Sequence, residues 1–136
     1  MEDCLFCKII NGEIPCNKVY ENEYTLAFLD ISPTNPGHTL VVPKKHFKNH
    51  EEIDELYLTE VHKTVKKVGR AIKNGLSSPG YNIIINNDQI AGQIIPHFHA
   101  HIVPRVEGDG FKHWPGGEYK EGQAEDVAQK ITNNIE

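Results

Sequence analysis

The sequence predicts an α+β fold, in which a five-stranded, mainly antiparallel sheet carries one long helix and short terminal helices. Three observations lead to this prediction. Short apolar runs bounded by Pro, Gly or Asn recur in the first third of the chain and again after residue 80, as strands do. A single long stretch, residues 54–74, has helical periodicity instead. The length of 136 residues suits one domain and is too short for two.

The first third of the chain predicts one short helix, a hairpin and a central strand. Residues 4–10 fit one or two helical turns. A hairpin follows over residues 19–30, with its turn at Asn22-Glu23. Pro, Asn and Gly make residues 31–37 a loop. The nearly continuous apolar run at 38–43 is typical of a strand in the middle of a sheet.

The long helix is predicted from a single apolar stripe with alternating spacings of three and four residues. The stripe comprises Leu58, Val61, Val65, Val68 and Ile72. We interpret the basic residues on the other faces as a solvated surface; they are Lys63, Lys66, Lys67, Arg70 and Lys73. Asn74-Gly75 is expected to end the helix.

The second half of the chain predicts two more strands and a short C-terminal helix. A strand at 81–86 and a loop at 87–95 precede a strand at 97–103, in which histidine and apolar residues alternate. Gly and Pro make the chain irregular beyond residue 105. Apolar residues at a spacing of four then predict a short closing helix: Val127, Ile131 and Ile135.

The charge and hydropathy of the chain narrow the classes of partner. A formal net charge of −5 argues against a nucleic-acid-binding protein, which usually carries a basic surface, although a local pocket can still bind a small anion. No apolar run approaches the length of a membrane span, and the acidic start Met1-Glu2-Asp3 lacks signal-peptide character. We therefore expect a cytoplasmic protein that binds neither nucleic acid nor membranes.

Histidine and apolar residues alternate in the segment from Pro96 to Pro104. Residues two apart in a strand point to the same face, about 6.6 Å from each other, so His97, His99 and His101 form a row. Such a row suits either metal binding or the handling of phosphate. The first and third imidazoles would lie about 13 Å apart, too far for both to bind one ion at about 2.1 Å. The spacing therefore favours different tasks for the three histidines.

The three cysteines make a poor disulfide set, because their number is odd and Cys4, Cys7 and Cys16 all lie near the N-terminus. The Cys4-x-x-Cys7 pair has two interpretations. One is a redox pair, although the sequence lacks the βαβ pattern that usually accompanies one. The other is half of a tetrahedral zinc site, which needs two further ligands; His46 and His97 are candidates.

These residues carry a resemblance to a known family. The segment His97-Phe98-His99-Ala100-His101-Ile102-Val103 resembles the signature of the histidine triad (HIT) family of nucleotide hydrolases and transferases. Further segments resemble the family in the same order: Phe6-Cys7-Lys8-Ile9-Ile10, Ile14-Pro15, Phe28–Pro33, Gly37–His46 and Ala91-Gly92-Gln93. The resemblance covers about residues 4–105. We expect this part to be the core of a single HIT domain over residues 1–136, with an extension at 106–136.

The resemblance implies three catalytic histidines. His99 would attack the α-phosphorus of a nucleotide and become transiently nucleotidylated. A neutral imidazole is a competent nucleophile near pH 7, because its ordinary pKa is about 6.5. His101 would contact the α-phosphate, and His38 would support His101 from the neighbouring strand.

The resemblance also implies a nucleotide pocket. Asn86 and Gln93 would donate hydrogen bonds to the phosphate or the leaving group, where charge develops. Asp30 would accept from the ribose hydroxyls. Apolar residues would enclose the base, although by their type alone they are equally ordinary core residues: Ile14, Phe28, Ile31 and Leu40.

One branch of the family carries zinc on two cysteines and two histidines, including the first histidine of the triad. By this resemblance Cys4, Cys7, His46 and His97 would hold a structural Zn²⁺ that pins the N-terminal segment to the sheet. The family further implies a meander sheet and a homodimer whose ligand is a purine nucleotide or a nucleotide conjugate.

Two places set this chain apart from the family. Ile94 follows Gln93, where the family often has Ser or Thr, whose hydroxyl assists at the scissile bond. The segment Lys112-His113-Trp114-Pro115 resembles the C-terminal end of one branch, but a helical tail follows it here. The resemblance therefore assigns no role to Trp114.

We hypothesise a HIT-type nucleotidyl hydrolase or transferase. It would cleave a nucleoside phosphoramidate or a dinucleoside polyphosphate at the α-phosphate, through a nucleotidyl-His99 intermediate, and release a nucleoside monophosphate. A second hypothesis is a nucleotide-binding regulatory module with little turnover, which Ile94 would favour. A third is a metalloenzyme that uses the triad histidines as ligands.

Overall fold

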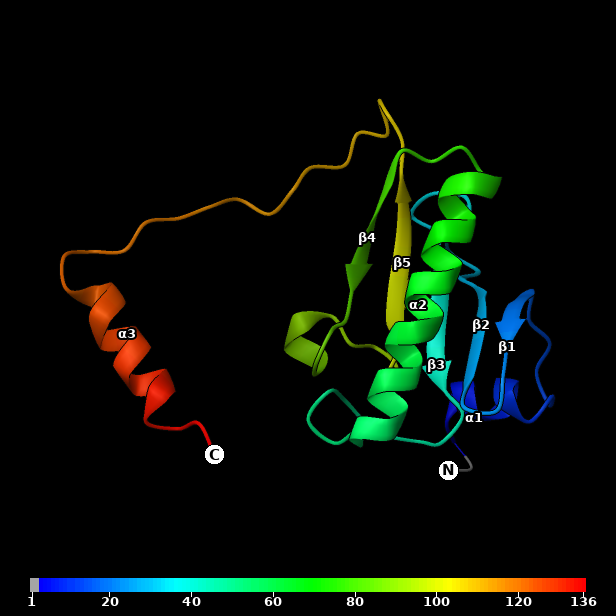
Figure 1. The fold of residues 1–136 in the computed structure, drawn as a ribbon, viewed down its shortest axis with the longest axis horizontal. Coiled ribbons are helices and arrows are strands. Elements are labelled where there is room, and N and C mark those ends of the chain that lie inside the picture. Colours follow the sequence, from blue (N-terminus) through cyan, green and yellow to red (C-terminus); the bar gives the residue numbers. More distant parts are fainter. Residues whose placement is uncertain (1–2) are drawn as a thin grey trace.

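The computed structural model describes residues 3–136, and Met1 and Glu2 of the acidic start lie outside the described residues. The elements are α1 (Leu5–Ile10), β1 (Lys18–Glu21), β2 (Thr25–Leu29), β3 (Thr39–Pro43), α2 (Glu55–Gly75), β4 (Gly80–Ile84), the 3-10 helix η1 (Gln89–Ala91), β5 (Ala100–Arg105) and α3 (Gln123–Thr132). The five strands form one antiparallel sheet, and α2 lies across one face of it (Figure 1). This confirms the predicted α+β class.

The order of strands in the sheet is β1-β2-β3-β5-β4. The first three strands are consecutive, and β3 is central and buried along its whole length, as its apolar run predicts. From β3 the chain crosses through α2 to β4 at the edge, and β5 then returns between β3 and β4. The alternating histidine segment therefore enters the interior of the sheet, with a strand on each side.

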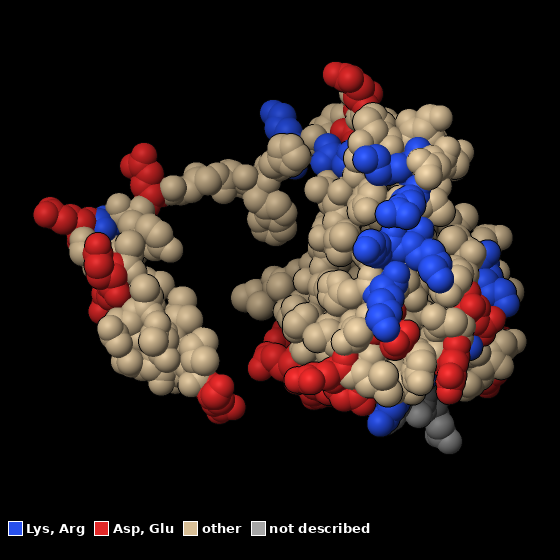
Figure 2. Space-filling view, in the orientation of Figure 1, with Lys and Arg blue, Asp and Glu red and all other residues tan. Residues whose placement is uncertain are grey.

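Helix α2 begins at Asp54, whose carboxylate accepts the N–H of Tyr57 at 2.9 Å. The predicted stripe is confirmed, because it packs on one face of the sheet. The residues of the sheet side in this cluster are Ala27, Val41, Phe98, Ala100 and Ile102. The basic side chains of α2 are exposed and gather along its outer surface (Figure 2).

The opposite face of the sheet carries a second apolar cluster, made by Phe6, Leu26, Phe28, Leu40 and Val42. Phe6 comes from α1 and the others from β2 and β3. Side chains alternate along each strand, so Leu40 and Val42 face this cluster while Val41 between them faces α2. The candidate site described below lies on this second face.

The histidine segment is less regular than the predicted strand at 97–103. β5 begins only at Ala100, because the N–H of Phe98 donates to the carbonyl of Phe47 at 2.7 Å, outside the strand ladder. The alternation of side chains nevertheless persists. Phe98 is buried in the α2 cluster, whereas His97 and His99 point to the opposite face and contact Phe6.

The C-terminal extension leaves the domain beyond β5 and ends in α3, which stands apart from the sheet (Figure 1). The helix predicted from Val127 and Ile131 is present, and Ile135 lies beyond its end. It does not close the core, since none of its residues is buried in the described part of the chain. Within residues 3–136, no helix is both long and apolar enough to cross a membrane.

Candidate active site and metal centre

A single hydrogen bond orients His99. Its side chain is buried, and its Nδ1–H donates to the carbonyl oxygen of His97 at 2.7 Å. This bond assigns the ring proton to Nδ1, so Nε2 keeps a free lone pair. Burial lowers the pKa of His99, while the bond to His97 and the charge of Asp30 raise it less. The ring is therefore neutral at pH 7, with Nε2 available as a nucleophile.

His38 and His101 form an ordered pair beside His99. The N–H of Thr34 donates to Nδ1 of His38 at 3.1 Å, which places the His38 proton on Nε2. That Nε2–H donates to Nδ1 of His101 at 2.9 Å, so His101 carries its own proton on Nε2. Burial, and then the neighbouring His99 and His38, lower the pKa of His101 to about 4. His101 therefore offers a neutral N–H donor, with its ring centre 4.9 Å from that of His99.

The rings of His99 and His101 border a cavity of about 320 Å³, which is within the size range of small-molecule sites. Eight of the residues predicted for the site line it: Ile14, Phe28, Asp30, Ile31, Leu40, Asn86, His99 and His101. His38 is not among the described residues that line the cavity, and it is connected to the cavity through its hydrogen bond to His101. Among the described residues that line the cavity, none is Lys or Arg, so a bound phosphate would meet neutral N–H donors.

Asp30 directly follows β2 and begins the loop that leads to His38. Its N–H donates to the carbonyl of His38 at 2.9 Å, which ties the two ends of the loop together. The Asp30 carboxylate accepts the N–H of Ser32 at 2.8 Å and lies 3.6 Å from Nε2 of His38. Its side chain stays 20% exposed at the cavity, so it can accept hydrogen bonds from ligand hydroxyls.

Asn86 and Gln93 were both predicted as hydrogen-bond donors, and only Asn86 lines the cavity. Gln93 is buried, with its Oε1 accepting the N–H of Asp88 at 2.8 Å and its Nε2 donating to the carbonyl of Lys48 at 2.6 Å. The Gln93 amide thus holds the loop after β4 through one acceptor bond and one donor bond. Ile94, the residue that departs from the family pattern, does line the cavity and is 85% exposed.

The ligand atoms of four side chains lie within 4.8 Å of one another: Cys4, Cys7, His46 and His97. Sγ of Cys4 is 3.3 Å from Nδ1 of His97, Sγ of Cys7 is 3.5 Å from Nδ1 of His46, and the two Nδ1 atoms are 3.1 Å apart. A tetrahedral zinc site requires about 3.6 Å between sulfur and nitrogen and about 3.3 Å between nitrogens. The donor set therefore fits one tetrahedral ion.

The protonation of these side chains also fits a cation. Nε2 of His97 donates to the carbonyl of Pro43 at 3.0 Å, so its Nδ1 directs a lone pair at the cluster. Burial lowers the pKa of His97 to about 4 and keeps it neutral. Burial, and then the adjacent Cys4, raise the pKa of Cys7 to about 11. Thiolates would form here only beside a positive charge, which a metal ion would supply.

Neither Phe6 nor Thr34 was predicted from the sequence to have a role in the site. Phe6 is buried between the two groups, and its ring centre lies 5.0 Å from that of His99 and 5.8 Å from that of His97, edge-on to both. The signals for Phe6 were its position between the two cysteines and its place in a segment that resembles the family. Thr34 acts through its backbone N–H, for which the residue type carries no signal at all.

Known proteins resemble this chain closely. The family model "HIT domain" matches residues 11–108. An uncharacterised HIT-like protein of Methanocaldococcus jannaschii is 56% identical over 107 residues, which cover 79% of this chain and 82% of that protein. An adenosine 5′-monophosphoramidase of Schizosaccharomyces pombe is 39% identical over 134 residues, which cover 94% and 98% of the two chains.

Solved structures resemble the fold over nearly its full length. A crystal structure of a HIT family protein from Bacillus anthracis matches with a TM-score of 0.89 at 40% identity and covers 99% of each chain. A crystal structure of a zinc-bound histidine triad family protein from Mycobacterium smegmatis matches with a TM-score of 0.78 at 32% identity, covering 98% of this chain and 99% of that one.

Proposed function

Because this chain belongs to the HIT family, we propose that it is a nucleotide hydrolase that works through a nucleotidyl-His99 intermediate. The observation that carries the proposal is the 2.7 Å bond from Nδ1–H of His99 to the carbonyl of His97, which leaves Nε2 free at the cavity. Relatives named as an adenosine 5′-monophosphoramidase and an adenylylsulfatase support hydrolysis of nucleotides at the level of the family.

The proposed reaction has two displacements at the α-phosphorus. Nε2 of His99 attacks the phosphorus, the bond to the leaving group breaks, and the leaving group takes a proton from water. His101 donates from Nε2 to a phosphoryl oxygen and stabilises the charge that develops there. The hydroxide left by that water then attacks the phosphorus, the bond between phosphorus and His99 breaks, and nucleoside monophosphate leaves with the enzyme regenerated.

The charge of the cavity favours one of the two substrate classes. A dinucleoside polyphosphate brings several negative charges, which proteins usually bind with Arg, Lys or a metal ion. The described residues that line this cavity include Asp30 and no Lys or Arg. We therefore propose a nucleoside phosphoramidate, or another conjugate with a single charged phosphate, as the substrate. Asp30 would accept from its ribose, and apolar residues such as Phe28 and Leu40 would pack on a purine base.

Mass spectrometry of protein quenched during turnover of an adenosine 5′-phosphoramidate tests the mechanism. We expect a nucleotidyl adduct on His99, which disappears in His99→Ala while nucleotide binding is retained. An adduct on another residue, or product formation by His99→Ala at the wild-type rate, would contradict the mechanism. Adenosine 5′-monophosphate is the binding probe for both proteins.

A nucleotide-binding regulatory module with little turnover is the alternative function. The observation that favours it is Ile94, which places an exposed hydrocarbon at the cavity where a hydroxyl would assist the leaving group. The same experiment separates the two functions. Binding of adenosine 5′-monophosphate with neither adduct nor product would favour the module.

We propose that Cys4, Cys7, His46 and His97 hold one structural Zn²⁺. The proposal is supported by their distances and by the zinc-bound relative from Mycobacterium smegmatis. The bound ion would supply positive charge that keeps both thiols deprotonated and holds α1 against the sheet. Elemental analysis of protein purified without added metal is expected to give about one zinc per chain. Purified wild type without stoichiometric zinc would refute the proposal.

We also propose that the protein is a homodimer in the cytoplasm. The edge strand β4 exposes Ile83 and Ile84 by 48% and 36%, and the extension exposes Trp114 by 91%. Apolar surface of this extent favours a protein partner. Light scattering is expected to give twice the chain mass, and removal of residues 112–136 is expected to weaken the dimer. A monomeric full-length protein at micromolar concentration would contradict this assignment.

A further inference from the structure

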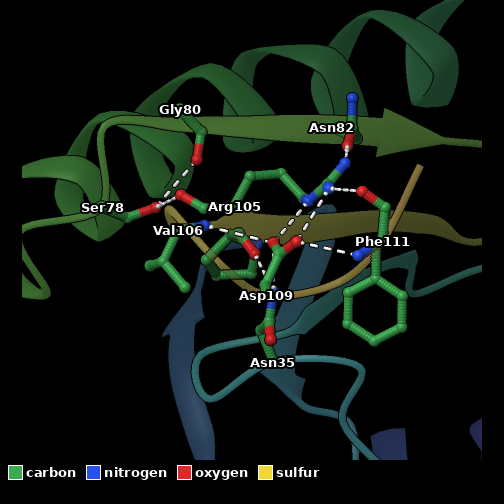
Figure 3. Close-up of polar contacts among 9 residues, drawn as sticks. Asn35, Ser78, Gly80, Asn82, Arg105, Val106, Asp109 and Phe111 are labelled. Atoms are coloured by element: carbon green, nitrogen blue, oxygen red, sulfur yellow. Dashed lines mark hydrogen bonds and ion pairs between the residues drawn. The ribbon is translucent and has the colours of Figure 1, made fainter. Parts of the chain in front are cut away.

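A cluster of hydrogen bonds ties the end of β5 to the start of the C-terminal extension (Figure 3). Arg105 donates from Nε and Nη2 to the two carboxylate oxygens of Asp109, at 2.8 and 3.0 Å. Arg105 also donates to the side chain of Asn82 on β4 at 3.0 Å and to the carbonyl of Phe111 at 2.7 Å. The Asp109 side chain is only 5% exposed. Asp109 is thus a buried carboxylate held in one orientation.

Asn35, in the loop between β2 and β3, is a further partner of Asp109 (Figure 3). Its Nδ2 donates to the Asp109 carboxylate at 3.1 Å and to the carbonyl of Pro104 at 2.8 Å. The backbone carbonyl of Asn35 accepts the N–H of His38 at 3.0 Å. The side chain of Asn35 therefore fastens the loop to β5, and its backbone fastens the loop to His38.

Thr34, next to Asn35, extends this connection to the cavity. Its N–H donates to Nδ1 of His38, which keeps the His38 proton on Nε2, facing Nδ1 of His101. If Thr34 moved away, His38 could carry its proton on Nδ1 and turn a lone pair toward His101. His101 would then be free to hold its proton on Nδ1, and its Nε2 could no longer donate to a phosphate.

We propose that Asp109 is a positioning residue for the histidines that contact phosphate. By holding Asn35 against β5, it keeps Thr34 bound to His38 and so keeps His101 in the tautomer that donates from Nε2. The inference rests on the proposed function of His101. Asp109 itself is not among the described residues that line the cavity, so its effect must pass through Asn35 and the loop.

Two variants and a matched control test the inference. Asn35→Ala removes the link to the loop and leaves the ion pair between Arg105 and Asp109 intact. Asp109→Asn weakens the anchor itself. Glu21→Gln is the control, since the Glu21 carboxylate also binds two cations, Lys18 at 2.8 Å and Lys44 at 2.7 Å, on β1 and just past the end of β3.

The readouts are steady-state kinetics with an adenosine 5′-phosphoramidate and ¹⁵N NMR of the imidazole nitrogens, which identifies tautomers. In the wild type we expect His38 and His101 to be protonated on Nε2. In Asn35→Ala and Asp109→Asn we expect a mixture of tautomers at His38, a kcat lower by about tenfold and a KM within about twofold of wild type. Glu21→Gln is expected to match wild type in both readouts.

Each outcome bears on the inference in a different way. Wild-type kcat in Asn35→Ala, or a lower kcat with wild-type tautomers, would overturn it. If Asp109→Asn fails to fold, Asp109→Glu, which keeps the charge and displaces the carboxylate, decides in its place, because Asn35→Ala also removes the bond to the carbonyl of Pro104. Absence of a nucleotidyl-His99 adduct in the wild type would refute the proposed function instead. A tautomer mixture at His38 in Asp109→Asn would still support the positioning role of Asp109.

Discussion

The carbonyl oxygen of His97 accepts the Nδ1–H of His99 at 2.7 Å, so the proposed metal ligand also orients the proposed nucleophile. Contacts of both ring nitrogens fix the position of His97: its Nε2–H donates to the carbonyl of Pro43, and its Nδ1 faces the cysteines. The two groups of the site are therefore coupled through one residue. A change at the metal centre is expected to reach the nucleophile through the position of this carbonyl.

Cys7→Ser tests this coupling, because it removes one metal ligand and leaves both histidines in place. We expect most of the zinc to be lost and kcat to fall by about tenfold. A loss of this size is typical when a residue that orients a reacting group is removed. Elemental analysis and steady-state kinetics measure the two effects. Cys16→Ser is the matched control for zinc content, since Cys16 lies outside the four-residue cluster. Full kcat in zinc-free Cys7→Ser would disprove the coupling.

Acid is expected to destabilise the protein in part through His101. Burial, His99 and His38 lower the pKa of His101 from 6.5 to about 4 in the folded chain. Between these values the unfolded state binds the proton and the folded state does not. The free energy of unfolding therefore falls as the pH is lowered from about 6.5 to about 4. Since the ring is partly exposed, we expect a loss of only about 1–2 kcal/mol from this group.

His101→Asn isolates this contribution, because the Asn oxygen can still accept the Nε2–H of His38 but does not titrate. Urea unfolding of both proteins near pH 7 and near pH 4.5 gives the two free energies for each. The variant is expected to lose less stability on acidification than the wild type. Identical losses would mean that His101 titrates alike in the folded and unfolded chains.

Ile94→Ser is expected to raise kcat for substrates with a poor leaving group. Ile94 lines the cavity and is 85% exposed, so replacing it costs little packing and introduces a hydroxyl donor. One added hydrogen bond in the transition state corresponds to an increase of about tenfold. Kinetics with a series of phosphoramidates of increasing amine basicity measures the effect. Ile94→Val, which adds no donor, is the control, and equal rates for both variants would argue against assistance from this position.

Gly37→Ala is expected to destabilise the loop between β2 and β3. Gly37 has a φ of +94°, and a Cβ there would collide with Cδ1 of Leu76 and lie 3.2 Å from Cγ of Pro104. We expect the free energy of unfolding to fall by about 2 kcal/mol, because a side chain is strained at this φ and must displace Leu76. Chemical denaturation measures the loss. Gly116→Ala, where a Cβ would meet no atom within 4 Å, should be nearly neutral.

Features that depend on periodic burial could be predicted from the sequence. The apolar stripe of α2 predicts one buried helix face, and the apolar run of β3 predicts a strand buried on both faces. The structure confirms both, since α2 packs on the sheet and β3 is buried throughout. The division of the three triad histidines also followed from strand geometry. His97 lies beside the cysteines and His101 bonds to His38, partners that the family resemblance implied and the spacing alone did not.

Features that depend on which distant segments meet could not be predicted in the same way. Gln93 has the chemistry of a ligand donor, and the sequence did not indicate that its amide also bonds to the N–H of Asp88 and the carbonyl of Lys48. The α3 pattern predicts a helix and does not say what the helix packs on. The ion pair between Arg105 and Asp109 was not predicted either, although the two residues are only four apart in the sequence.

By itself, the sequence determined the fold class and the central strand, because the order of residue types reflects burial and alternation; the membership of the two groups of reactive side chains was implied by the resemblance to a family. Only the tertiary structure decided which protons those side chains carry. The orientation of His99 depends on the carbonyl of His97, and that of His101 depends on His38 and the N–H of Thr34. Backbone groups are alike at nearly every position, so residue order does not record which of them a fold brings within hydrogen-bond distance.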